Sequence, residues 1–118
     1  MSKKIIALVL AMLMVVSIFA ACGSKDTTEG GTIKIGLSGP LTGAAAVYGV
    51  AVKNAAEMAA EEINAAGGLN GMKFTLIAVD DQNDAAKIST NYSNLVEQGM
   101  QVSLGTVTTK PGREFTNL

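Results

Sequence analysis

Two loops of this chain combine glycine with small hydroxyl side chains, which are the groups best suited to hold a small anion. The first loop covers residues 38–49, and the second covers residues 105–110. Each comes before a stretch with a helical pattern, and the backbone N–H groups at the beginning of a helix favour a carboxylate or a phosphate. The second loop also carries three hydroxyl donors, Thr106, Thr108 and Thr109.

Each of these loops also has an explanation that needs no ligand. Ser38 and the Gly-Pro pair after it form a pattern typical of a turn, and Thr108 and Thr109 are equally suited to cap the helix that follows them. Tyr48, at the end of the first loop, is expected to lie partly in the core. Its ring would also give a small ligand an apolar wall beside the glycine-rich loop.

A third loop carries three carboxylates, Asp80, Asp81 and Asp84. The alternating positions Asp80, Gln82 and Asp84 are similar to those of a calcium-binding loop, but Ala85 stands where such a loop needs glycine and Asn91 where it needs glutamate. This excludes a calcium site. Asp84 is suited to cap the next helix, whereas Asp80 and Asp81 are expected to be solvated loop residues.

The composition of the chain excludes several classes of site. The 118 residues suffice for one small domain and include no histidine, which excludes a Ser-His-Asp triad and the commonest zinc ligand sets. The single cysteine excludes an internal disulfide and a multi-cysteine metal site. The net charge of −1 gives no electrostatic footprint for nucleic acid, and no Walker motif occurs. Most classes of enzyme therefore lose support, and we expect a protein that is not an enzyme and needs no cofactor, although composition leaves an acidic or nucleotide-dependent enzyme open.

Residues 1–21 are typical of a secretion signal. Lys3 and Lys4 supply the positive beginning, residues 5–19 form an apolar run, and two alanines precede Cys22. A retained transmembrane helix is the alternative, but a span needs about 20 apolar residues and this run is shorter. Residues 22–32, rich in glycine, serine and threonine, are expected to form a flexible tether.

Phe19-Ala20-Ala21-Cys22 resembles the lipobox of bacterial lipoproteins. This resemblance implies that the Cys22 thiol carries a lipid and anchors the exported protein to the outer face of the cytoplasmic membrane. Phe19 departs from the leucine that is usual in the lipobox. Without lipidation, Cys22 would be a buried apolar residue at the end of the signal helix.

Residues 33–118 contain three apolar runs with strand character. They predict strands at residues 33–37, 73–79 and 100–104, and in the last of these Val102 and Leu104 are expected to face inward.

Helical patterns alternate with these strands. In the first, Val52, Ala55, Ala56, Ala59 and Ile63 form an apolar face, and a glycine pair ends the helix. An Asn-Gly pair then predicts a tight turn at residues 70–71. A second helix is expected over residues 85–98, and a third beginning at residue 113.

The β-α-β-α-β order indicates an α/β fold with a parallel sheet. Ligands of such sheets bind beyond the carboxyl ends of the strands, so the three loops should meet at one edge.

Six short motifs follow one another along residues 33–118. They are Ile35-Gly36, Gly39-Pro40-Leu41-Thr42-Gly43, Tyr48-Gly49, Glu61-Glu62-Ile63-Asn64-Ala65-Ala66-Gly67-Gly68, Asn70-Gly71, and Asp80-Asp81 with Asp84. In this order and spacing they resemble the beginning of the branched-chain amino acid type of solute-binding protein, the receptor of an ATP-driven importer.

The resemblance implies a type I periplasmic binding protein, in which two α/β lobes close on a ligand. Because family members are longer, residues 33–118 are expected to form an incomplete N-terminal lobe. The implied ligand is a branched-chain or related amino acid or an amide, and the implied partners are the permease subunits of the importer.

The same resemblance implies roles for individual residues. In the family, the loop after the third strand holds the ligand's α-carboxylate, which maps onto Val107, Thr108 and Thr109, with threonine in place of the usual serine. Tyr48 would line the pocket, and Ser38 would lie nearby.

Two alternatives stay open from the sequence. One is half of a Rossmann-like or flavodoxin-like domain in a nucleotide-dependent enzyme. The other is the ligand-sensing domain of a membrane receptor, which shares this fold. Binding of an amino acid rather than a nucleotide would separate the importer reading from the enzyme reading.

Overall fold

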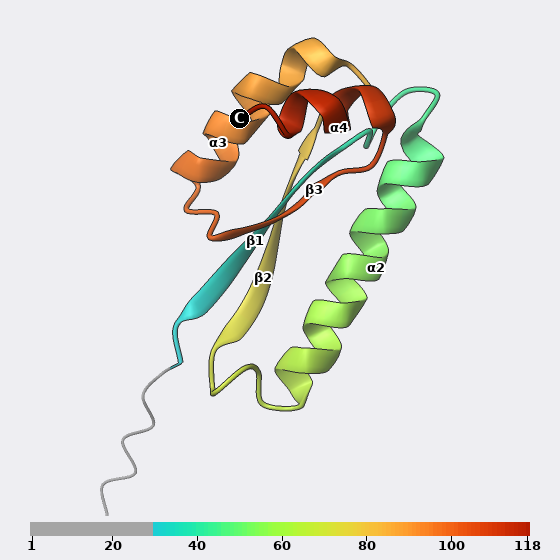
Figure 1. Ribbon diagram of the computed structural model, residues 1–118. Coiled ribbons are helices and arrows are strands. Elements are labelled where there is room, and N and C mark those ends of the chain that lie inside the picture. The colour runs from blue at the N-terminus through green and yellow to red at the C-terminus, as the bar shows by residue number, and fades with distance from the viewer. Residues whose placement is uncertain (1–29) are drawn as a thin grey trace, which may run out of the picture.

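The computed structural model describes residues 30–118, which form a three-stranded parallel sheet covered by helices on both faces (Figure 1). The strands are β1 (Thr32–Gly39), β2 (Lys73–Asp80) and β3 (Val102–Thr106), arranged in the order β2-β1-β3. Helix α2 (Ala46–Ala65) packs on one face, mainly against β2. The other face carries the short 3-10 helix η1 (Ala85–Lys87), α3 (Ile88–Glu97) and α4 (Thr109–Phe115).

This architecture confirms the predicted α/β fold and its parallel β-α-β-α-β order. The strand register brings Ile35 of β1 opposite Leu76 of β2 and Val102 of β3. The predicted signal peptide, the lipobox and residues 22–29 of the predicted tether lie outside the described residues, and the last tether residue, Thr32, begins β1. None of the helices in residues 30–118 has the length and apolar character needed to cross a membrane.

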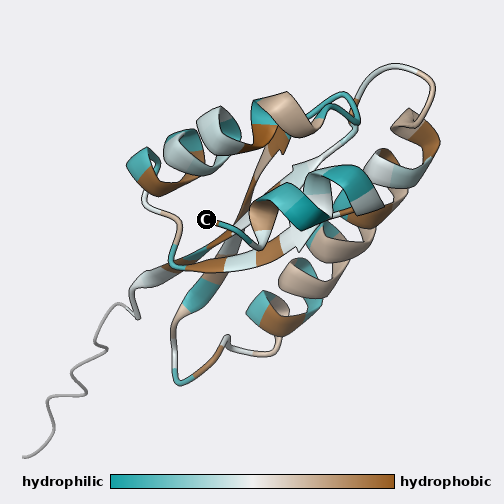
Figure 2. Ribbon diagram, turned by 45° about the horizontal axis from the view of Figure 1, so that its top comes forward, coloured by the Kyte–Doolittle hydropathy of each residue, from teal (hydrophilic) through white to brown (hydrophobic). Residues whose placement is uncertain are grey.

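The core occupies both faces of the sheet: Leu37 shares the α2 face of β1 with Ile35, whereas Ile88 and Leu95 pack from α3 onto the opposite face. Leu37 in β1, together with Ile88 and Leu95 of α3, is completely or almost completely buried. Hydrophobic residues of the strands lie between α2 and the pair of α3 and α4 (Figure 2). At the outer end of this layer the rings of Tyr92 and Phe115 meet edge to face, with centroids 5.6 Å apart, which fixes α4 against α3.

The turn between α2 and β2 follows the sequence prediction. Asn70 and Gly71 have φ angles of 53° and 83°, and Leu69 pairs with Met72 across them. Two consecutive positive φ angles are what a two-residue hairpin turn requires, and an Asn-Gly pair adopts them at low cost. The turn therefore places β2 beside β1 immediately after α2 ends.

The third strand differs from its prediction. It runs over Val102–Thr106 rather than over residues 100–104, and it continues through Gly105, where the pairing with β1 shifts by one residue. Val102 and Leu104 are 53% and 50% exposed, so the expected inward pair is only half covered, although Leu104 does line the space between α2 and the sheet. In residues 30–118, β3 pairs on one side only, and α2 covers β2 rather than β3.

Two helices also differ in detail. The last helix begins at Thr109, four residues earlier than predicted, so Pro111 lies in its first turn, where proline is tolerated. The buried side of α2 is centred on Gly49 and Ala60, whereas Val52 and Ile63 of the predicted apolar face are both partly exposed. Since α2 packs mainly against one edge strand, only a narrow stripe of it is covered.

Candidate functional site

The three loops meet at the carboxyl ends of the strands, as the sequence predicted. Ser38 at the end of β1 is paired with Thr106 at the end of β3. The Leu41 N–H donates to Asp80 at the end of β2 over 2.8 Å. We call this region, formed by residues 39–48, 80–83 and 107–109, the loop edge; it lies at the end of the sheet where the strand arrows point (Figure 1).

The Asp80 carboxylate joins two of these loops. Its Oδ1 accepts hydrogen bonds from the N–H groups of Leu41 at 2.8 Å, Thr42 at 3.4 Å and Gln82 at 2.9 Å. Its Oδ2 accepts a hydrogen bond from the Thr42 hydroxyl. Desolvation raises the pKa of Asp80, but these four hydrogen bonds outweigh it and lower the pKa to about 2. The side chain is therefore ionised at neutral pH and holds the first loop.

The neighbouring Asp81 is fully buried, with 0% of its surface exposed. Its Oδ1 accepts a hydrogen bond from the Asn83 N–H at 2.8 Å, and its Oδ2 accepts one from the Ser38 hydroxyl at 3.4 Å. Burial raises the pKa of Asp81, and these hydrogen bonds only partly oppose it. The expectation that both aspartates are solvated is therefore wrong, because both turn inward to satisfy backbone N–H groups and hydroxyls of the adjacent loops.

Ser38 lies beneath the loop edge rather than on it. Its side chain is fully buried, and besides donating to Asp81 its hydroxyl accepts a hydrogen bond from the Asn91 side chain at 3.2 Å. Asn91 also donates to the Asp80 carbonyl oxygen at 3.3 Å, which ties α3 to β1 and β2. In this arrangement the Ser38 hydroxyl is occupied by protein groups and supports the loops from below.

Tyr48 projects from the first turn of α2, and its side chain is 64% exposed. The next residue, Gly49, is buried against the first loop. A Cβ added at Gly49 would lie 2.1 Å from the Pro40 carbonyl oxygen, which no side chain could tolerate. Glycine at this position therefore lets the loop and the helix touch, and this contact fixes where the helix, and with it Tyr48, begins.

The loop after β3 has a polar group without a partner. The Thr108 hydroxyl oxygen is buried, and within residues 30–118 no group forms a hydrogen bond with it. Thr108 stands at the N-cap position of α4, yet its side chain makes no capping bond. Val107 lies against β1, since a Cβ added at Gly39 would be 3.0 Å from a Val107 methyl group, and Thr109 is exposed.

The loop edge presents hydroxyl and N–H groups, which are the kind of donors that suit a small anionic molecule. Among residues 30–118 no group of three or more potential metal-ligating side chains occurs. Sequence reasoning missed the positions of Asp80 and Asn91. Thr42 and Asp80 lie far apart in the sequence, and only strand pairing brings them together. Cys22 lies outside the described residues.

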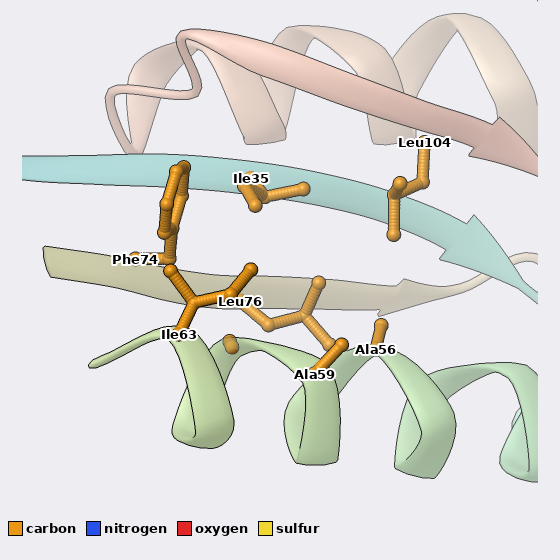
Figure 3. A pocket seen from close by; sticks show the side chains of 8 residues that line it. Ile35, Ala56, Ala59, Ile63, Phe74, Leu76 and Leu104 are labelled. Atoms are coloured by element: carbon orange, nitrogen blue, oxygen red, sulfur yellow. The ribbon is translucent and has the colours of Figure 1, made fainter. Parts of the chain in front are cut away.

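An apolar cavity of about 140 Å³ lies between α2 and the sheet, away from the loop edge (Figure 3). Small side chains of α2 face larger ones of the strands across it, and the residues that line it are Ile35, Ala56, Ala59, Ala60, Ile63, Phe74, Leu76 and Leu104. A ligand site needs a few polar groups to orient its ligand, and none of these side chains offers one. The cavity is therefore a packing gap and not the candidate site.

Comparison with known proteins places the chain among binding proteins. A family model described as periplasmic binding protein matches residues 32–116. The Leu/Ile/Val-binding protein BraC3 of Rhizobium johnstonii is 41% identical over 76 residues, which cover 64% of this chain and 21% of that protein. The leucine-, isoleucine-, valine-, threonine- and alanine-binding protein of Pseudomonas aeruginosa is 36% identical over 87 residues, covering 74% of this chain and 23% of that one.

A solved structure shows the same arrangement of elements. The branched-chain amino acid transporter substrate-binding protein LivJ of Streptococcus pneumoniae, crystallised with isoleucine, matches with a TM-score of 0.68 and 31% identity. The match covers 73% of this chain and 25% of that structure. This chain thus spans about a quarter or less of the length of these three relatives.

Proposed function

Because this chain belongs to the periplasmic binding protein family, we propose that it forms part of the extracytoplasmic receptor of an ABC importer and takes part in binding a branched-chain or related amino acid or amide. Its relatives carry the names of proteins that bind leucine, isoleucine and valine. The family consists of binding proteins, which argues against the alternative of a nucleotide-dependent enzyme.

The observation that best supports this proposal is the unpaired hydroxyl of Thr108. A buried hydroxyl without a partner costs about 1–3 kcal/mol, so a ligand carboxylate that accepted its hydrogen bond would remove that cost. The N–H groups of Leu41 and Thr42 in the first loop are already engaged by Asp80. We therefore assign the α-carboxylate of the ligand to the loop of Val107, Thr108 and Thr109.

The other predicted residues take supporting positions in this proposal. Tyr48 is exposed at the loop edge and would form an apolar wall beside the ligand. Ser38 would not touch the ligand but would hold the loops in place through its buried hydrogen bonds with Asp81 and Asn91. The permease subunits, export by the signal peptide, and anchoring through a lipid on Cys22 belong to the same proposal.

Equilibrium dialysis with radiolabelled leucine, isoleucine and valine tests the proposal on the protein expressed from its complete gene. We expect binding of at least one of them. Thr108→Ala should weaken that binding about tenfold, the value of one hydrogen bond to a charged group. Thr108→Ser, which keeps the hydroxyl, should bind like the wild type.

Thr90→Ala is the matched control, because Thr90 is an exposed threonine of α3 that is not one of the residues of the loop edge. It should leave the affinity unchanged. Failure to bind any of these amino acids, together with binding of ATP in the same assay, would overturn the proposal in favour of the enzyme reading.

A further inference from the structure

The first loop is held by a carboxylate that comes from the end of a different strand. Asp80 at the end of β2 accepts the N–H groups of two consecutive residues, Leu41 and Thr42, on one oxygen. Consecutive N–H groups that converge in this way form a concavity that binds anions in many proteins. Here a side chain of the protein itself fills that concavity.

Asp80 also fixes its own loop by the same contacts. The Gln82 N–H donates to the oxygen that accepts Leu41 and Thr42, at 2.9 Å, and the Thr42 hydroxyl donates to the other oxygen. One carboxylate therefore ties the loop after β1 to the loop after β2. The bonds involve an ionised acceptor, which makes them stronger than hydrogen bonds between neutral groups.

The position of the first loop is transmitted to α2. Pro40 is fully buried, and its carbonyl oxygen lies against Gly49 in the first turn of the helix. The remainder of the loop closes onto the helix through hydrogen bonds from Ala46 N–H to the Gly43 carbonyl and from Tyr48 N–H to the Ala45 carbonyl. A shift of Leu41 and Thr42 would therefore move the turn that carries Tyr48.

We propose that Asp80 is a positioning residue for the ligand site: it acts as an internal anion that locks the first loop, sets the place of Tyr48, and keeps a ligand carboxylate away from the first loop. The effect on the ligand rests on the proposed function. The locking of the loop does not, since it follows from contacts within the chain.

Hydrogen exchange measured by mass spectrometry tests the locking of the loop in the protein expressed from its complete gene. Asp80→Asn keeps the size of the side chain but removes its charge. We expect exchange in residues 40–48 to become about tenfold faster, the effect of losing one charge-assisted hydrogen bond. Exchange in residues 73–79 and 88–97 should stay as in the wild type.

Asp84→Asn is the matched control for charge. Asp84 lies in the same loop, but it caps η1 by accepting the Ala86 N–H and does not touch the first loop. It should leave exchange in residues 40–48 unchanged. Thr42→Val, which removes only the hydroxyl, should give a smaller increase than Asp80→Asn, and Thr42→Ser should restore the wild-type rate.

The affinity for L-isoleucine, measured by calorimetry on the same variants, tests the effect on the ligand. We expect Asp80→Asn to lower it about tenfold, while Thr42→Ser and Asp84→Asn keep it. Unchanged exchange in residues 40–48 would refute the inference. So would faster exchange with an unchanged affinity, because the lock would then not position the site.

Two further outcomes separate this inference from other failures. If the wild type does not bind isoleucine, the proposed function fails for that ligand, and the exchange data alone decide whether Asp80 locks the loop. If Asp80→Asn speeds exchange throughout the chain, the comparison of Thr42→Val with Thr42→Ser decides: a difference confined to residues 40–48 supports the lock, and no difference overturns it.

Discussion

At the scale of single residues, the two adjacent aspartates show how differently one side chain type can be used. Asp80 is ionised with a pKa of about 2, because four hydrogen bonds outweigh its desolvation. Its contribution to stability is therefore present above the unfolded-state pKa of 3.8 and is lost as the pH falls toward 2. The contribution of Asp81 to stability depends on pH in the opposite sense, because burial raises its pKa and deprotonation therefore destabilises the folded state.

The raised pKa of Asp81 gives a prediction for Asp81→Asn. The asparagine oxygen can accept a hydrogen bond from the Asn83 N–H, and its amide can donate to the Ser38 hydroxyl oxygen in place of the bond that this hydroxyl now donates to Asp81, without a buried charge. We expect the free energy of unfolding at pH 7 to rise by about 0.5–1 kcal/mol. Because protonation favours the folded wild type, its stability falls as the pH rises through the raised pKa, so the advantage of the variant should vanish at acidic pH.

Urea denaturation of both proteins at a series of pH values measures this difference. Asp81→Ala is the control, because it leaves the Asn83 N–H and the Ser38 hydroxyl without their partner and should cost about 1–3 kcal/mol. An Asp81→Asn variant that is as unstable as Asp81→Ala at pH 7 would show that the charge itself is needed.

At the scale of elements, an asparagine near the end of α2 makes the backbone hydrogen bonds that a neighbouring strand would make to β2. The Asn64 side chain donates to the Phe74 carbonyl at 2.8 Å and accepts the Phe74 N–H at 2.7 Å. In the described sheet β2 is an edge strand, and an edge strand presents unpaired backbone groups. Asn64 therefore satisfies both groups of one edge residue and joins helix to strand.

Asn64→Ala should lower the free energy of unfolding by about 1–3 kcal/mol, since it leaves both Phe74 groups without these partners. Asn64→Asp keeps an acceptor for the N–H but loses the donor, and it should lie between the wild type and the alanine variant. Thermal denaturation followed by circular dichroism measures both. If Asn64→Ala melted at the same temperature as the wild type, water would replace the hydrogen bonds of the side chain at no cost in free energy. The stability of the edge strand β2 would then not depend on Asn64.

At the scale of the whole molecule, residues 30–118 leave much apolar surface uncovered. Val102 and Leu104 on β3 are about half exposed, and Leu104 borders the apolar cavity beneath α2. Small domains bury a smaller fraction of their surface than large ones, and the core here depends on a few side chains such as Leu37, Ile88 and Leu95. The stability of this segment by itself should therefore be marginal.

We predict that a protein of residues 30–118 alone melts below about 60 °C, within the ordinary range for small domains. Leu37→Ala should unfold it at room temperature, because Leu37 is 1% exposed and a buried leucine contributes about 2–5 kcal/mol. Leu104→Ala, at 50% exposure, should change the melting temperature little. Scanning calorimetry checks all three, and a cooperative melt well above 60 °C would contradict marginal stability.

The sequence by itself determined the order and type of the elements. Apolar runs marked the strands, three- and four-residue spacing marked the helices, and the Asn-Gly pair marked the turn at residues 70–71. Asp84 was also assigned correctly as a helix cap. These features depend on residues close together in the chain, so a local pattern carries them.

Only the tertiary structure decided which loop groups are free and which are engaged. Asp80 meets Thr42 across 38 residues of sequence, and Asn91 meets Ser38 across 53, because parallel strands bring their carboxyl ends to one edge. The exposure of Val102 and Leu104 depended equally on where α2 packs. Such contacts join distant segments, and their partners leave no periodic signal in the sequence. Folding therefore decided that the hydroxyls of Ser38 and Thr42 donate hydrogen bonds to aspartates, whereas that of Thr108 has no partner within residues 30–118.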